Sequence, residues 1–104
     1  MSEVKLTVHP FEMGLPKESA VKVLEEAAES FAEWQSVDYC IEFRSACNLC
    51  PFDRGDGECA YKRDLADELA DCIQACCNLA DRYNIDLQAA MGRCEQRNRE
   101  RGRY

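Results

Sequence analysis

The chain has 104 residues, which is the length of one small domain rather than two. It contains no apolar run long enough to cross a membrane, and its net charge of −7 argues against non-specific binding to nucleic acid. Its first residues do not resemble a signal peptide, so we expect a cytoplasmic protein.

The N-terminal part is expected to lead into one long helix. Residues 2–16 contain two prolines and a glycine, and we expect them to be irregular or to form a short strand. The first helix is expected over residues 17–37. Its core stripe is predicted from apolar residues that recur at helical spacing, namely Val21, Leu24, Ala28 and Phe31. An adjacent polar stripe holds Lys22, Glu26, Glu29 and Glu33.

Two further helices are expected after a middle segment at residues 38–62, which carries four cysteines and several helix breakers. The second helix spans residues 63–82, and its core stripe comprises Leu65, Leu69, Cys72, Cys76, Leu79 and Tyr83. Asn84 tolerates the left-handed conformation and is predicted to stop this helix. Asp86 is predicted to cap a third helix from Leu87 to about Arg101.

These elements predict an all-α fold in one domain over residues 1–104, with a Cys-containing insertion at about residues 38–62. The fold is expected to be a helical bundle of three main helices. A chain this short buries only a modest core. We therefore expect dimerisation to complete a four-helix core.

Two acidic clusters are the most informative feature of the chain. One lies in the first helix (Glu25, Glu26 and Glu29) and the other in the second (Glu68 and Asp71). Carboxylates three or four residues apart share one side of a helix, where their like charges repel. A bound cation is the natural reason to keep them together, and hard oxygen ligands suit Mg²⁺ or Mn²⁺.

The order of these motifs resembles the MazG-like all-α nucleoside triphosphate pyrophosphohydrolases. The resemblance is carried by residues 22–29, 68–71 and 79–87, and by a basic, Asn-containing tail from Arg93 to Gly102. It implies a homodimer or homotetramer that hydrolyses nucleoside triphosphates to monophosphate and pyrophosphate with Mg²⁺. Such an activity would serve nucleotide-pool house-cleaning. The two acidic clusters are separated by residues 30–67, a longer gap than the family usually has.

The resemblance also implies roles for single residues. The metal ligands would be Glu26, Glu29, Glu68 and Asp71. Glu25 would be either a further ligand or the catalytic base that accepts a proton from the attacking water. The substrate-binding positions would be Lys22, Asn78, Arg93, Asn98 and Arg101. Two simpler interpretations remain: Lys22 can pair with Glu26 four residues later, which we favour, and the arginines can be a solvated helix end.

The cysteines of the middle segment allow a second metal site. Cys40, Cys47, Cys50 and Cys59 could together bind Zn²⁺ or an iron–sulfur cluster. Their spacing lacks the second C-x-x-C pair of a ribbon-type site, so free or packed thiols are the favoured interpretation.

Two other functions are consistent with the sequence. The chain could be a small zinc-stabilised helical interaction module without catalysis, whose acidic helix faces are merely solvated. It could also be a phosphoribosyl-ATP pyrophosphohydrolase, which shares the chemistry. We rank that activity lower because the segment after Asp71 lacks histidine.

Overall fold

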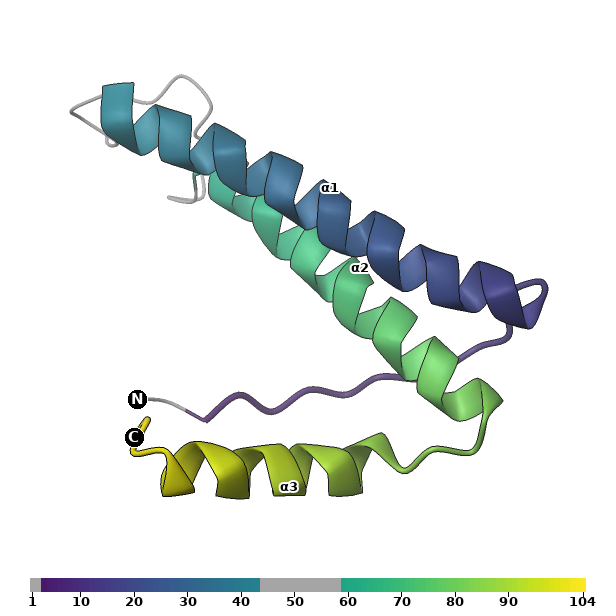
Figure 1. The fold of residues 1–104 in the computed structure, drawn as a ribbon. Coiled ribbons are helices and arrows are strands. Elements are labelled where there is room, and N and C mark those ends of the chain that lie inside the picture. Colours follow the sequence, from purple (N-terminus) through teal and green to yellow (C-terminus); the bar gives the residue numbers. More distant parts are fainter. Residues whose placement is uncertain (1–2, 44–58) are drawn as a thin grey trace.

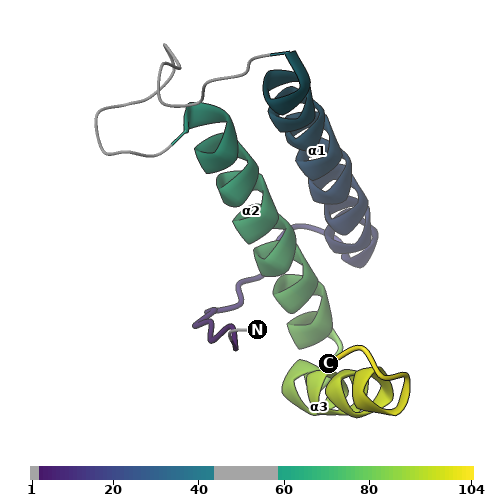
Figure 2. The same ribbon diagram turned by 90° about the vertical axis from the view of Figure 1, so that its left-hand side faces the viewer.

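The computed structural model describes residues 3–43 and 59–104, and three helices account for most of them. They are α1 (Pro16–Phe43), α2 (Ala60–Arg82) and α3 (Leu87–Glu100). α1 and α2 lie side by side and run in opposite directions, whereas α3 lies beyond the end of α2 (Figures 1 and 2). The described residues contain no strand, so the prediction of an all-helical fold is confirmed. The N-terminal segment is irregular, and the alternative of a short strand there is wrong.

The first two helices are longer than predicted. α1 continues through residues 38–43, and α2 begins at Ala60 rather than at residue 63. Proline stands at the first position of α1, where its missing N–H costs no helical hydrogen bond. No glycine or proline interrupts the chain between Pro16 and Pro51, which explains why α1 passes the predicted end. The connection between α1 and α2 is therefore shorter than the predicted insertion.

The turn between α2 and α3 has the predicted chemistry. Asn84 has a φ of 53°, in the left-handed region. The N–H of Ile85 donates to the carbonyl of Ala80 at 2.9 Å, and the N–H of Asn84 donates to Asp81 at 3.1 Å, which is the Schellman pattern. The Asp86 side chain then accepts a hydrogen bond from the Ala89 N–H at 2.9 Å and caps α3. Both predictions at this turn are confirmed.

The N-terminal segment, residues 3–15, passes alongside α2 (Figure 1). Three side chains of α2 form hydrogen bonds to its backbone. The Oδ1 of Asn78 accepts from the Phe11 N–H at 3.0 Å, and the Nε2 of Gln74 donates to the His9 carbonyl at 3.1 Å. The Nη1 of Arg82 donates to the Met13 carbonyl at 3.3 Å. Polar residues of α2 thus fix a segment that has no secondary structure of its own.

α1 faces α2 with a largely polar stripe. Its buried residues are Ser19, Glu26, Ser30 and Cys40. The apolar stripe predicted to be core points the other way: Leu24 is 71% exposed and Phe31 is 59% exposed. Because successive helical residues are rotated by about 100°, these two lie on the side of α1 opposite Glu26. The core prediction for α1 is therefore wrong for the single chain.

The single chain has little apolar interior. Its buried hydrophobic residues are all small (Cys40, Ala60, Ala75 and Ala80), and no described side chain is both large and fully buried. The radius of gyration is 16.9 Å, whereas a compact domain of this length has about 13 Å. Among the described residues, no helix is both long enough and apolar enough to span a membrane.

Candidate metal centre

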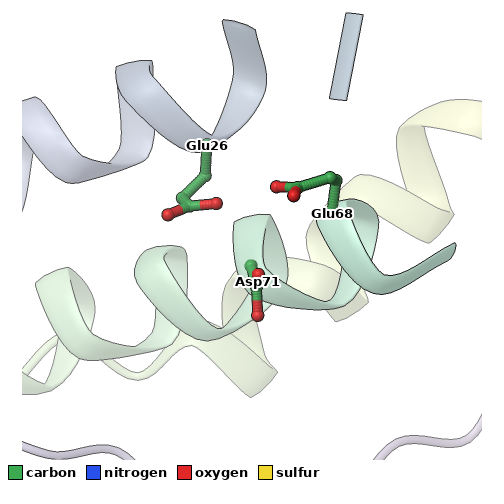
Figure 3. A group of neighbouring side chains, drawn as sticks. All are labelled: Glu26, Glu68 and Asp71. Carbon is green, nitrogen blue, oxygen red and sulfur yellow. The ribbon is translucent and has the colours of Figure 1, made fainter. Parts of the chain in front are cut away.

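Three carboxylates predicted to be metal ligands meet between α1 and α2. Glu26 comes from the middle of α1, and Glu68 and Asp71 come from successive turns of α2. One oxygen atom from each lies within 4.8 Å of the others. Figure 3 shows Glu26 and Glu68 reaching toward each other across the gap between the helices, with Asp71 beside them. The antiparallel pairing of α1 and α2 thus joins two clusters that are far apart in the sequence.

The cluster is partly removed from water. Glu26 is only 5% exposed, and Glu68 is half-buried. The Oε1 of Glu26 lies 2.8 Å from the Nζ of Lys22, which confirms the favoured ion pair. The Oε2 atoms of Glu26 and Glu68 are both buried and receive no hydrogen bond from the described residues. Buried carboxylate oxygens without a donor are costly, and a cation would satisfy them.

The pKa values of the two glutamates move in opposite directions. Burial, together with the neighbouring carboxylates of Glu29, Glu26 and Asp71, raises the pKa of Glu68 to about 7. The hydrogen bond from Lys22 lowers the pKa of Glu26 despite its burial. One carboxylate of the pair is thus compensated by a lysine, while the other forms no ion pair with the described residues.

The remaining acidic candidates lie at the edge of the cluster. Glu29 is exposed, but it is close enough to Glu68 to raise its pKa. The side chain of Glu25 is 54% exposed, and its Oε2 lies 3.8 Å from the Nζ of Lys22. The structure therefore groups three of the five acidic candidates, with Glu29 beside Glu68 and with Glu25 connected to the cluster through Lys22.

The predicted substrate-binding residues are divided between two places. Asn78 is 5% exposed and holds the N-terminal segment through its bond to Phe11. Arg93, Asn98 and Arg101 lie on or just after α3, which follows the end of α2 and is separated from α1 in both ribbon views (Figures 1 and 2). None of these three is a member of the carboxylate cluster or of the lining of the cavity beside it. Their predicted role in substrate binding stays a prediction.

A cavity of about 260 Å³ adjoins the cluster and was not predicted. It shares Glu26, Asp71 and Lys22 with the carboxylate site, and its other walls include Phe11, Met13, Gln74 and Asn78. Sequence reasoning singled out Asn78 but missed Phe11, Met13 and Gln74. The one available signal was the polar pair Gln74 and Asn78, four residues apart on one side of α2.

The cysteines proposed as a zinc site are only partly described. Cys40 is buried on α1, and Cys59 is half-buried immediately before α2. Cys47 and Cys50 lie outside the described residues. Within residues 3–43 and 59–104, the one group of side chains with metal-ligand geometry is the carboxylate cluster. The zinc site stays a prediction.

Comparison of the chain with protein-family models, with curated proteins and with solved structures finds no match in any of the three. Any functional conclusion therefore depends on the chemistry of the residues described above.

Proposed function

We propose that the protein is a Mg²⁺-dependent hydrolase that converts nucleoside triphosphates to monophosphate and pyrophosphate. The observation that carries the proposal is the meeting of Glu26, Glu68 and Asp71, with two buried carboxylate oxygens that lack a donor. A solvated acidic face would leave these oxygens in water. A cluster that buries them between two helices is suited to a cation.

The donor set fits the proposed metal. All the ligands on offer are carboxylate oxygens, which Mg²⁺ and Mn²⁺ prefer, and no thiol or imidazole is among them. Glu26, Glu68 and Asp71 would hold the ion, and Glu29 stands close enough to contribute. Bound there, the ion would neutralise the triphosphate charge and lower the pKa of a coordinated water.

The other residues have separate tasks in this proposal. Glu25 is exposed and lies 3.8 Å from Lys22, and in this proposal it is either a further ligand or the base that accepts a proton from the attacking water. Lys22 is the cation next to the ligands, and its ammonium group can transfer from Glu26 to a phosphate oxygen of the substrate. Both tasks use groups that the structure places at the edge of the cluster.

The proposal includes a homodimer, or a tetramer built from it. The apolar stripe of α1 that faces away from α2 includes Val21, Leu24 and Phe31, and all three are exposed. Phe31 also stacks near Trp34, with ring centroids 5.5 Å apart, which enlarges the patch. If a second copy of the chain packed its own α1 stripe against this one, both stripes would be buried and the two helix pairs would form a four-helix core. An enzyme of the nucleotide pool works where its substrates are, so a cytoplasmic location is part of the proposal.

A nucleotide panel tests the activity. Purified protein is incubated with each common ribo- and deoxyribonucleoside triphosphate and Mg²⁺, and pyrophosphate and orthophosphate are measured separately. The proposal expects pyrophosphate and monophosphate in equal amounts, and no turnover when a chelator removes the metal. Release of orthophosphate alone, or no turnover of any nucleotide, would contradict it.

A further inference from the structure

The cavity beside the carboxylate cluster combines two kinds of wall. Its lining joins the carboxylates of Glu26 and Asp71 to the apolar side chains of Phe11 and Met13. A ligand that fills it must therefore combine a cation-binding anionic part with an apolar part. A bare polyphosphate would leave the apolar walls without a partner.

The backbone that carries the apolar walls is held by hydrogen bonds to side chains of α2. The Oδ1 of Asn78 accepts from the Phe11 N–H at 3.0 Å and from the Nε2 of Gln74 at 2.9 Å. The same Nε2 donates to the His9 carbonyl at 3.1 Å. These bonds fix the backbone on both sides of Pro10, and yet Phe11 is left 52% exposed. An anchored, half-exposed aromatic ring in a cavity wall is a platform for a flat ligand.

Two amide side chains, those of Gln74 and Asn78, add polar groups to the cavity wall. Asn78 is nearly buried, and its carbonyl oxygen is already used twice. Gln74 also lines the cavity, and the hydrogen bonds of its Nε2 to Asn78 and to the His9 carbonyl hold its amide group in place. An aromatic ring, a thioether and amides together match an uncharged planar heterocycle with hydrogen-bonding edges.

We propose that this cavity binds the base of the nucleotide, with Phe11 as the stacking platform, Met13 as the apolar wall and Gln74 as a group that reads the edge of the base. The inference rests on the proposed function, because the cavity shares Glu26 and Asp71 with the cluster that would hold the triphosphate. In this proposal, the N-terminal segment helps to determine which nucleotide the site binds.

The test compares a nucleotide with its base-free counterpart. Phe11→Ala removes the ring but keeps the N–H that bonds to Asn78, so the segment should stay in place. For the preferred nucleotide, this variant should raise KM about tenfold, which is the usual effect of losing one stacking side chain. The inhibition constant of inorganic triphosphate with Mg²⁺ should not change. Val4→Ala is the matched control, since Val4 lies in the same segment, is 76% exposed and lines no part of this cavity.

An equal loss of affinity for the nucleotide and for inorganic triphosphate would overturn the inference, as would an unchanged KM. Either result leaves nucleotide turnover by the wild-type protein intact, so it is distinguishable from failure of the proposed function, in which the wild type itself does not act on nucleotides.

A second measurement avoids substitution of Phe11. The chain has three methionines, and ¹³C labelling of their methyl groups gives signals that Met13→Leu assigns. Nucleotide with Mg²⁺ should shift the Met13 signal, while inorganic triphosphate with Mg²⁺ should not. A Met13 signal that does not shift when the nucleotide and Mg²⁺ are added would also overturn the inference.

Discussion

Lys22 and Glu26 form an ion pair one helical turn apart, with the Nζ of Lys22 2.8 Å from the Oε1 of Glu26. The second oxygen of the same carboxylate is buried and has no donor among the described residues. One oxygen of the Glu26 carboxylate is therefore paired with Lys22, and the same carboxylate lies in the cluster with Glu68 and Asp71. In the absence of metal, Lys22 is the cation that offsets the repulsion within the cluster, and a divalent ion must compete with it.

Removal of the lysine charge should make the thermal stability of the protein depend more strongly on bound metal. In Lys22→Met, the carboxylates repel without compensation, so the metal-free variant should melt at a lower temperature than the wild type. Added Mg²⁺ should raise its melting temperature more than that of the wild type, because the ion no longer competes with an ammonium group. Thermal unfolding with chelator and with Mg²⁺ measures both effects. Lys17→Met, at an exposed position of α1, serves as the control. An identical Mg²⁺ response in all three proteins would contradict the prediction.

Loss of single carboxylates should strongly reduce turnover but keep the fold. Glu29→Gln and Asp71→Asn each remove a negative charge at almost constant size, so they should reduce kcat/KM by about 100-fold or more. Their helical circular dichroism should match the wild type, because relief of repulsion does not damage packing. Glu33→Gln is a matched control, since Glu33 lies on α1 but outside the cluster. Near-wild-type activity of both variants would remove these residues from the site.

Glu68 should make the metal-free protein less stable as the pH rises. Its pKa is about 7 in the folded protein, against an ordinary value of 4.5, so folding favours its protonated form. The stability that it contributes is complete below its ordinary pKa and is lost as the pH rises through about 7. Glu68→Gln mimics the protonated form at every pH.

With chelator present, the wild type and Glu68→Gln should have similar unfolding free energies near pH 4.5, and the wild type should be the less stable of the two well above pH 7. Denaturant unfolding at a series of pH values measures this difference. The pKa of Glu26 shifts in the opposite direction, and its largest cause, the hydrogen bond from Lys22, is present in both proteins. A difference that does not change with pH would show that Glu68 does not titrate in this range.

A charge on the outward face of α1 should break the proposed dimer. Phe31 is 59% exposed in the single chain, so Phe31→Lys should leave the α1–α2 pair intact. It would place a charge in the centre of the interface and weaken dimerisation about tenfold or more. Sedimentation equilibrium at micromolar concentration measures the effect, with Val4→Lys as the control. A monomeric wild type would contradict the dimer itself.

Local chemistry made parts of this structure predictable. The left-handed Asn84 and the Asp86 cap follow from short-range patterns. The meeting of Glu26 with Asp71 was expected from the resemblance to the pyrophosphohydrolases, which implied that both residues belong to one site. The direction of the α1 stripe was not predictable, because periodicity shows that Leu24 and Phe31 share a face but not what covers that face.

The cavity was missed for a different reason. The backbone groups of His9 and Phe11 bond to side chains more than sixty residues away, and such long-range contacts leave no pattern in the sequence. The half-exposed state of Phe11 is likewise a result of tertiary structure. The grouping of three of the carboxylates was therefore expected from the sequence, while the cavity wall beside them was not.

The most direct test of the account is whether the carboxylate cluster binds a divalent ion. Mn²⁺ can replace Mg²⁺ at oxygen ligands, and electron paramagnetic resonance measures free Mn²⁺ in a titration with the protein. The wild type is predicted to bind at least one Mn²⁺ per chain, in competition with Mg²⁺, and Glu26→Gln and Asp71→Asn are predicted to lose this binding. A wild type that leaves all of the Mn²⁺ free, or variants that bind it equally well, would contradict the account.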